Sequence, residues 1–163
     1  MNWMKKVAVA LVCLLPLGLQ AAKVDTLQVK SPSMNKSIEV VVVSPDMAAT
    51  EACPVIYLLH GYGGNARTWV GIKPDLPKIA DEKGIFFVCP DGKNTWYWDS
   101  PLNADVRYET FISDELVKYV DSHYKTVADR KGRAITGLSM GGHGAMWNGL
   151  RHSDVFSAAG STS

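Results

Sequence analysis

Short apolar runs alternate with amphipathic stretches through the first half of the chain. Residues 54–59 and 85–88 are continuous apolar runs, the pattern of strands that are buried on both faces. A helical stretch around residues 74–83 separates them, which predicts two parallel strands joined by a right-handed crossover. Upstream, a β-branched run within residues 36–44 predicts a strand that pairs antiparallel with residues 26–30 through a Ser-Pro-Ser-Met-Asn turn.

The second half of the chain continues this alternation. An apolar stripe at helical spacing predicts a helix over residues 108–124. A strand over 133–136, a helix over 140–151 and the beginning of a strand within 156–160 follow. No linker or shift in composition divides the chain, so we expect one α/β domain over residues 22–163, with a mostly parallel sheet and helices on both faces.

The N-terminus has the pattern of a secretory signal peptide over residues 1–21. Lys5 and Lys6 precede an apolar core over 7–19, and this core is too short to span a bilayer. The alternative is a buried core helix, which Pro16 would break. We therefore expect export to the periplasm or the medium, without a stable membrane anchor.

Composition and charge exclude several classes of partner. The chain carries 17 basic and 16 acidic residues, and the predicted signal peptide removes two of the basic ones. Without a basic run there is no electrostatic basis for binding nucleic acid.

No His, Cys, Asp or Glu cluster has the spacing of a metal site, and we expect no metal or other cofactor. Cys53 and Cys89 are expected at opposite ends of neighbouring parallel strands, too far apart for a disulfide.

The sequence Gly-x-Ser-x-Gly follows the predicted strand 133–136 and opens the next helix, with Gly137, Ser139 and Gly141 at its fixed positions. This is the pattern of a nucleophile elbow, in which a serine occupies a sharp strand-to-helix turn and glycine on either side leaves room for it. The motif alone occurs by chance in roughly one chain in twenty of this length. Its context favours a catalytic Ser139, whose acid and histidine partners would follow it in sequence.

A second signature, His60-Gly-Tyr-Gly-Gly-Asn65, stands at the carboxyl end of a predicted buried strand. A glycine-rich turn there can aim backbone N–H groups at an oxyanion, and we assign Tyr62 and Met140 as the two donors. Gly63 would line the substrate pocket. The alternative interpretation of these glycines is a tight strand-to-helix turn without further role.

Two further features bear on substrate and mechanism. The aromatic run Trp96-Tyr-Trp98 follows the strand that ends near Cys89, so Trp98 either lines a wall for a sugar or phenolic acyl group or covers the core. His143 lies four residues after Ser139 on the same helix. We interpret it as structural, because the base of such a serine approaches from a different loop.

Together these motifs resemble the esterase-D-like family of α/β-hydrolases, which includes feruloyl and acetylxylan esterases, S-formylglutathione hydrolases and mycobacterial mycolyltransferases. The segments that carry the resemblance are Leu58–Gly64, Pro90–Gly92, Trp98–Pro101, Tyr108–Phe111 and Gly137–Ala145. It covers the whole mature chain but only the N-terminal part of the family's domain.

The resemblance implies serine carboxylesterase chemistry on Ser139, with a small-molecule or polysaccharide ester as substrate and no cofactor. Export favours carbohydrate-linked esters of the feruloyl or acetyl type. In relatives a C-terminal part supplies the catalytic acid and histidine, so we expect the 163 residues alone to be a fragment that is nearly inactive and unstable. Acyl transfer to a sugar, or carbohydrate binding without catalysis, are the alternatives.

Overall fold

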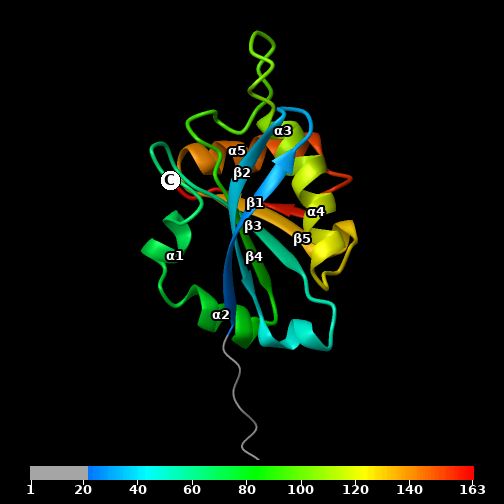
Figure 1. Ribbon diagram of the computed structural model, residues 1–163. Coiled ribbons are helices and arrows are strands. Elements are labelled where there is room, and N and C mark those ends of the chain that lie inside the picture. The colour runs from blue at the N-terminus through cyan, green and yellow to red at the C-terminus, as the bar shows by residue number, and fades with distance from the viewer. Residues whose placement is uncertain (1–21) are drawn as a thin grey trace, which may run out of the picture.

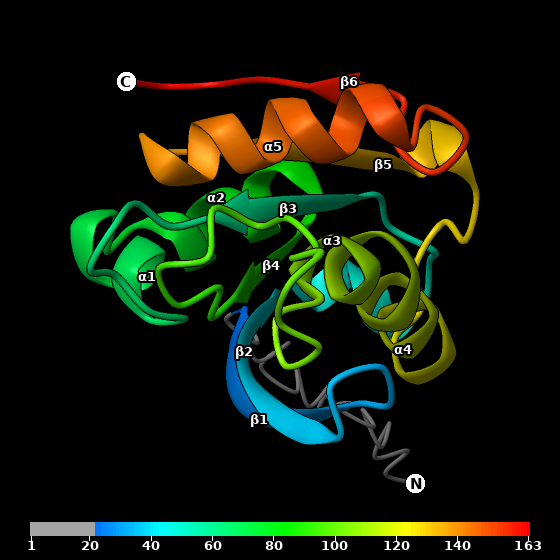
Figure 2. The same cartoon turned by 90° about the horizontal axis from the view of Figure 1, so that it is seen from above.

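The computed structural model describes residues 22–163, so the predicted signal peptide lies outside the described residues. Six strands form one mixed sheet, in the order β1-β2-β4-β3-β5-β6 (Figures 1 and 2). The strands are β1 (Lys23–Ser31), β2 (Lys36–Ser44), β3 (Val55–Leu59), β4 (Phe86–Pro90), β5 (Arg133–Gly137) and β6 (Ala158–Ala159). The expected hairpin is confirmed, because β1 and β2 pair antiparallel along their whole length. The central strands β4, β3, β5 and β6 are parallel, also as predicted.

Helical segments cover both faces of this sheet. The α-helices are α1 (Thr68–Ile72), α2 (Leu76–Lys83), α3 (Tyr108–Thr110), α4 (Leu116–His123) and α5 (Met140–Arg151). A π-turn, η2 (Phe111–Glu115), joins α3 to α4, and the 3₁₀ turns are η1 (Asp46–Ala49) and η3 (Arg130–Gly132). The short helix α1 and the turn η1 were not predicted from the sequence.

Alternate residues of each central strand point to opposite faces, and this produces two cores. On one face Tyr57 and Leu59 of β3 pack with residues of α3, α4 and α5. On the other face Leu58 packs with α1 and α2, through residues such as Leu76 and Ala80. Figure 2 shows α5 and α4 on one side of the sheet and α1 and α2 on the other. Burial on both faces explains why these strands are continuous apolar runs in the sequence.

The helix predicted over residues 108–124 differs from the structure in one respect. The segment is helical from Tyr108 to His123, but its middle turn is a π-turn. Asp99 accepts hydrogen bonds from the backbone and side chain of Thr110, at 3.0 and 2.5 Å, and fixes the beginning of this segment. Periodicity at 3.6 residues cannot reveal a single wider turn.

Both cysteines of the described region are free, as predicted. Cys53 precedes β3 and Cys89 lies at the end of β4, and both side chains are buried. Burial raises the pKa of each thiol. Within residues 22–163, none of the helices has the length and apolar character needed to cross a membrane.

Candidate active site

Ser139 stands between the end of β5 and the first turn of α5, in a strained conformation. Its backbone has φ 53° and ψ −113°, which is unusual for any residue with a side chain. Its N–H donates to the carbonyl of Thr162 at 2.8 Å, so the turn is held by the segment that follows β6. The residue itself is exposed. The fold therefore presents the Ser139 hydroxyl at the carboxyl edge of the sheet.

Close backbone packing on both sides of Ser139 makes this turn possible. A Cβ built on Gly137 would stand 2.4 Å from the carbonyl group of Gly141. A Cβ on Gly141 would stand 2.2 Å from the carbonyl oxygen of Leu59 at the end of β3. Neither position has room for a side chain, because the obstructing atoms belong to the backbone.

The glycine-rich turn after β3 lies directly beside Ser139. A Cβ on Gly61 would be 3.3 Å from the Leu138 carbonyl oxygen and 3.7 Å from the Ser139 Cβ. Within residues 22–163, neither the Tyr62 N–H nor the Met140 N–H donates a hydrogen bond. The structure thus leaves the two amides that the sequence singled out free for a ligand, one in the turn and one in the elbow. Gly63 has φ +77° and is exposed beside them.

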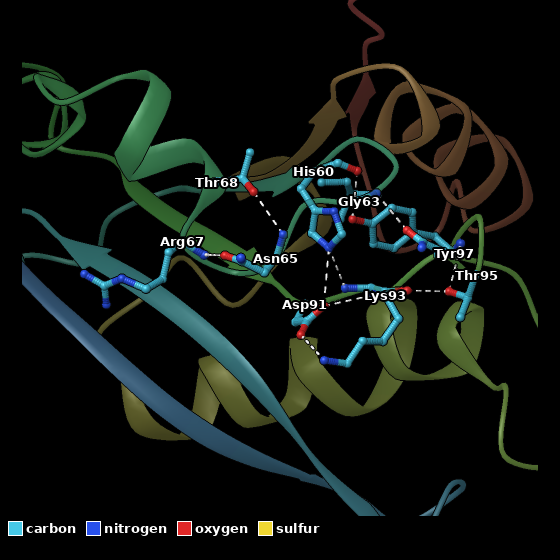
Figure 3. A network of polar contacts seen from close by, with 12 residues as sticks. His60, Gly63, Asn65, Arg67, Thr68, Asp91, Lys93, Thr95 and Tyr97 are labelled. Carbon is cyan, nitrogen blue, oxygen red and sulfur yellow. Dashed lines mark hydrogen bonds and ion pairs between the residues drawn. The ribbon is translucent and has the colours of Figure 1, made fainter.

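His60 connects this turn to the loop after β4. Its Nδ1 lies 2.7 Å from the Gly61 carbonyl oxygen, and its Nε2 lies 3.0 Å from the Gly92 amide nitrogen (Figure 3). A carbonyl can only accept and an amide N–H can only donate, so Nδ1 carries the proton and Nε2 accepts. The buried imidazole therefore braces the turn through both of its ring nitrogens.

The Asp91 carboxylate lies beside the His60 ring, with Oδ1 3.5 Å from Nε2. Lys93 folds back onto it, with Nζ at 2.6 Å from Oδ2 and its backbone N–H at 2.9 Å from Oδ1. Burial raises the pKa of Asp91, but the hydrogen bonds from Lys93 and its positive charge outweigh burial and hold that pKa well below its usual range. Asp91 is thus ionised and already neutralised by Lys93.

The loop from residue 92 to 98 is strained and tied to both the turn and α5. Trp96 and Tyr97 both have positive φ, at 60° and 59°. The Asn94 Oδ1 accepts from the Gly63 N–H at 2.8 Å, and the Tyr97 hydroxyl donates to the His60 carbonyl at 3.0 Å. The loop therefore holds the glycine-rich turn through Asn94 and Tyr97, in addition to the contacts of the His60 ring. Asn94 was not predicted as a site residue, because nothing in a single sequence marks its contact with Gly63.

The aromatic run divides between the two interpretations that the sequence left open. Tyr97 is fully buried and fills the space left by two glycines, whereas Trp96 and Trp98 are 44% and 45% exposed. Trp98 packs edge-on against Trp147 of α5, with ring centroids 6.2 Å apart. One residue of the run therefore belongs to the core, and the two tryptophans present faces to solvent.

No histidine of the described region is hydrogen-bonded to the Ser139 side chain. His143 lies one turn along α5, and its ring packs edge-on against Trp96 at 5.3 Å. His152 pairs with Glu109 at 2.9 Å. In the same region, no group of three or more His, Cys, Asp or Glu side chains is arranged to hold a metal ion.

Glu109 forms a second polar centre, at the far end of α5. Its buried carboxylate accepts hydrogen bonds from the side chains of Trp147, Arg151 and His152, at 2.6, 2.8 and 2.9 Å. Burial raises its pKa, but these hydrogen bonds outweigh burial and lower the pKa below its ordinary value. The group fastens α3 to α5, and its partners are spread too widely in the sequence for any motif to show it.

The strained serine, the packed glycines and the mixed sheet define an α/β-hydrolase. The "Putative esterase" family matches residues 31–163, and the chain belongs to this family. It is similar to an endo-1,4-beta-xylanase/feruloyl esterase of Xylanibacter ruminicola, at 34% identity over 116 residues, covering 65% of this chain and 16% of that protein.

Solved structures agree with this assignment. A ferulic acid esterase superposes with a TM-score of 0.72 at 32% identity, over 84% of this chain and 58% of that one. An S-formylglutathione hydrolase from Agrobacterium tumefaciens gives a TM-score of 0.75 at 25% identity, over 83% of this chain and 56% of that one. The chain thus spans little more than half of these structures.

Proposed function

We propose that Ser139 is the nucleophile of an exported serine carboxylesterase that acts on carbohydrate-linked esters of the feruloyl or acetyl type. The observation that carries this proposal is the strained, exposed Ser139 between the two packed glycines. Strain of this kind persists only where the surrounding structure enforces it, and it concentrates at functional sites. Export rests on the signal-peptide pattern, and the carbohydrate-linked substrate rests on the similarity to the xylanase/feruloyl esterase and the ferulic acid esterase.

The site's own groups provide part of the reaction. The Ser139 hydroxyl attacks the ester carbonyl carbon, and the N–H groups of Tyr62 and Met140 stabilise the negative oxygen of the tetrahedral intermediate. The alcohol then leaves, and water releases the acid from the acyl-enzyme. Losing one oxyanion donor lowers kcat on the order of a hundredfold or more.

The half-exposed tryptophans support the proposal for a bulky substrate. Trp96 contacts His143, which stands one helical turn beyond Ser139, so an aromatic face lies close to the nucleophile. Trp98 continues this face beside Trp147. A phenolic acyl group or a sugar ring would stack on such a surface.

Residues 22–163 do not place a catalytic base beside the Ser139 hydroxyl. A serine hydroxyl is a weak nucleophile unless a neighbouring base takes its proton. We therefore propose that these residues alone hydrolyse esters only at the low rate that an oxyanion site sustains without a base. Measuring the intact mass of the mature protein from its natural host would show whether further residues accompany them.

Active-site labelling tests the assignment of Ser139. The protein, produced in its natural host, would be treated with a fluorophosphonate, and the modified peptide located by mass spectrometry. We expect the label on Ser139, no label in Ser139→Ala and unchanged labelling in Ser122→Ala, which removes an exposed serine on α4. A label on another residue, or none at all, would overturn the proposal. Product analysis with added sugar acceptors separates hydrolysis from acyl transfer.

A further inference from the structure

A polar cleft of about 460 Å³ lies beside the glycine-rich turn, and the catalytic assignment does not use it. Its walls come from β2 around Glu39, from Asn65 and Arg67 after the turn, and from Asp91 and Lys93 after β4. Its volume falls within the range of small-molecule sites, about 300–1,000 Å³. Figure 3 shows Asn65 and Arg67 on one loop and the Asp91–Lys93 pair on the next.

The order of the strands fixes where this cleft lies relative to Ser139. The Asp91 loop follows β4 and Ser139 follows β5, while β3 and its glycine-rich turn lie between them. Neighbouring strands are about 4.8 Å apart, so the two loops are separated by roughly 10 Å. A ligand that reaches both positions must be longer than a single sugar ring. An ester of an oligosaccharide meets this requirement.

The charges in the cleft are not balanced. Lys93 is neutralised by Asp91, but two further cations have no carboxylate partner within residues 22–163. The Arg67 guanidinium donates only to the Thr26 hydroxyl, at 2.9 Å, and Lys36 donates to the Asp105 carbonyl at 2.7 Å. In the same region the Glu39 carboxylate takes part in no hydrogen bond or ion pair.

The cleft therefore carries one positive charge in excess. In addition, the Arg67 guanidinium has N–H groups that donate to no other group within residues 22–163. A guanidinium presents a planar fork that matches a carboxylate. The amide of Asn65 supplies a donor and an acceptor for sugar hydroxyls. The unpartnered Glu39 carboxylate accepts hydrogen bonds from hydroxyl groups but repels a second carboxylate.

We propose that this cleft binds a carboxylate-bearing sugar unit of the substrate's saccharide, with Arg67 as its main contact. The inference rests on the proposed function, because it places this sugar about 10 Å from the ester that Ser139 attacks. It assigns Arg67 and Glu39 opposite effects on the affinity. Arg67 attracts the carboxylate, whereas Glu39 weakens its binding while contacting hydroxyls.

Binding to the Ser139→Ala protein tests the proposal without requiring turnover. Two probes of equal backbone length would be titrated calorimetrically, xylotetraose with one glucuronic acid branch and plain xylotetraose. We expect the acidic probe to bind on the order of tenfold more tightly, in a salt-sensitive manner. Arg67→Gln should abolish this preference, and Glu39→Gln should increase it. Lys78→Gln, which removes an exposed lysine of α2, is the matched control and should change nothing.

The outcomes separate this inference from the proposed function. Equal affinity for both probes, or a preference that survives Arg67→Gln, overturns the carboxylate subsite. Weaker binding of both probes in Arg67→Gln and Glu39→Gln alike would indicate a neutral sugar and also overturns it. Failure of Ser139 labelling, with the acidic preference intact, overturns the esterase and leaves a saccharide-binding protein. Thermal unfolding of each variant verifies that it is folded.

Discussion

The backbone of Gly141 lies against the carbonyl of Leu59, so that a Cβ on Gly141 would stand 2.2 Å from that oxygen. Gly141→Ala must therefore separate α5 from β3 or deform the elbow. We expect the free energy of unfolding to fall by about 1–3 kcal/mol. Gly71→Ala is the control, because nothing lies within 4 Å of its Cβ, and it should stabilise helix α1 by about 0.5–1 kcal/mol. Urea unfolding of both variants measures the difference, and equal stability would contradict the close packing.

Asn94 is expected to position the glycine-rich turn that carries Tyr62, the proposed oxyanion donor. Its Oδ1 accepts a hydrogen bond from the N–H of Gly63, the residue that follows the proposed donor Tyr62. We expect Asn94→Ala to slow fluorophosphonate labelling of Ser139 by roughly tenfold. The Tyr62 N–H would be displaced, and the transition state would lose stabilisation comparable to that of one hydrogen bond. Asn103→Ala removes a similar side-chain bond, to the Asp105 N–H, in an exposed loop and should label normally. If both variants are labelled at the normal rate, Asn94 does not position the turn.

Glu109 should make stability depend on pH in a defined direction. Its pKa in the fold lies below the ordinary value of 4.5, so its ionised form contributes stability that is fully present above about pH 4.5 and is lost as pH falls through the folded pKa. We expect Glu109→Gln to destabilise the protein by about 1–3 kcal/mol at pH 7. Unfolding curves from pH 7 to pH 3 should show this difference shrinking. A difference that stays constant with pH would mean that the charge of Glu109 contributes nothing.

The two cysteines should react only when the protein unfolds. Cys53 and Cys89 are buried, and burial raises the pKa of both thiols, so little reactive thiolate forms at neutral pH. A thiol reagent should find almost no reaction in native mature protein and two thiols in denaturant without reductant. A count of zero in denaturant would instead show a disulfide.

The sequence contained enough information for the sheet and for the elbow. Strands buried on both faces are continuous apolar runs, so β3, β4 and β5 were recognisable within one or two residues of their bounds. Gly137 and Gly141 were readable because a motif with a steric reason fixes their positions relative to Ser139.

Long-range polar contacts could not be read in the same way. The His60 brace, the Asn94 contact and the Glu109 group join residues 31 to 43 positions apart. Nothing in local periodicity encodes such distances. The π-turn within residues 111–115 was invisible for a related reason, because its apolar pattern is that of an ordinary helix.

Tyr97 occupies the space where two side chains would otherwise be. A Cβ on Gly92 would stand 2.0 Å from one edge of its ring, and a Cβ on Gly144 would stand 2.5 Å from the other. The three positions therefore share one volume, and none of them can change size independently. Enlarging either glycine requires a smaller residue at position 97. A substitution at one of these positions that is damaging alone should therefore be compensated by a second substitution at another. As a result, the sequences of the loop after β4 and of helix α5 can change at these positions only in combination.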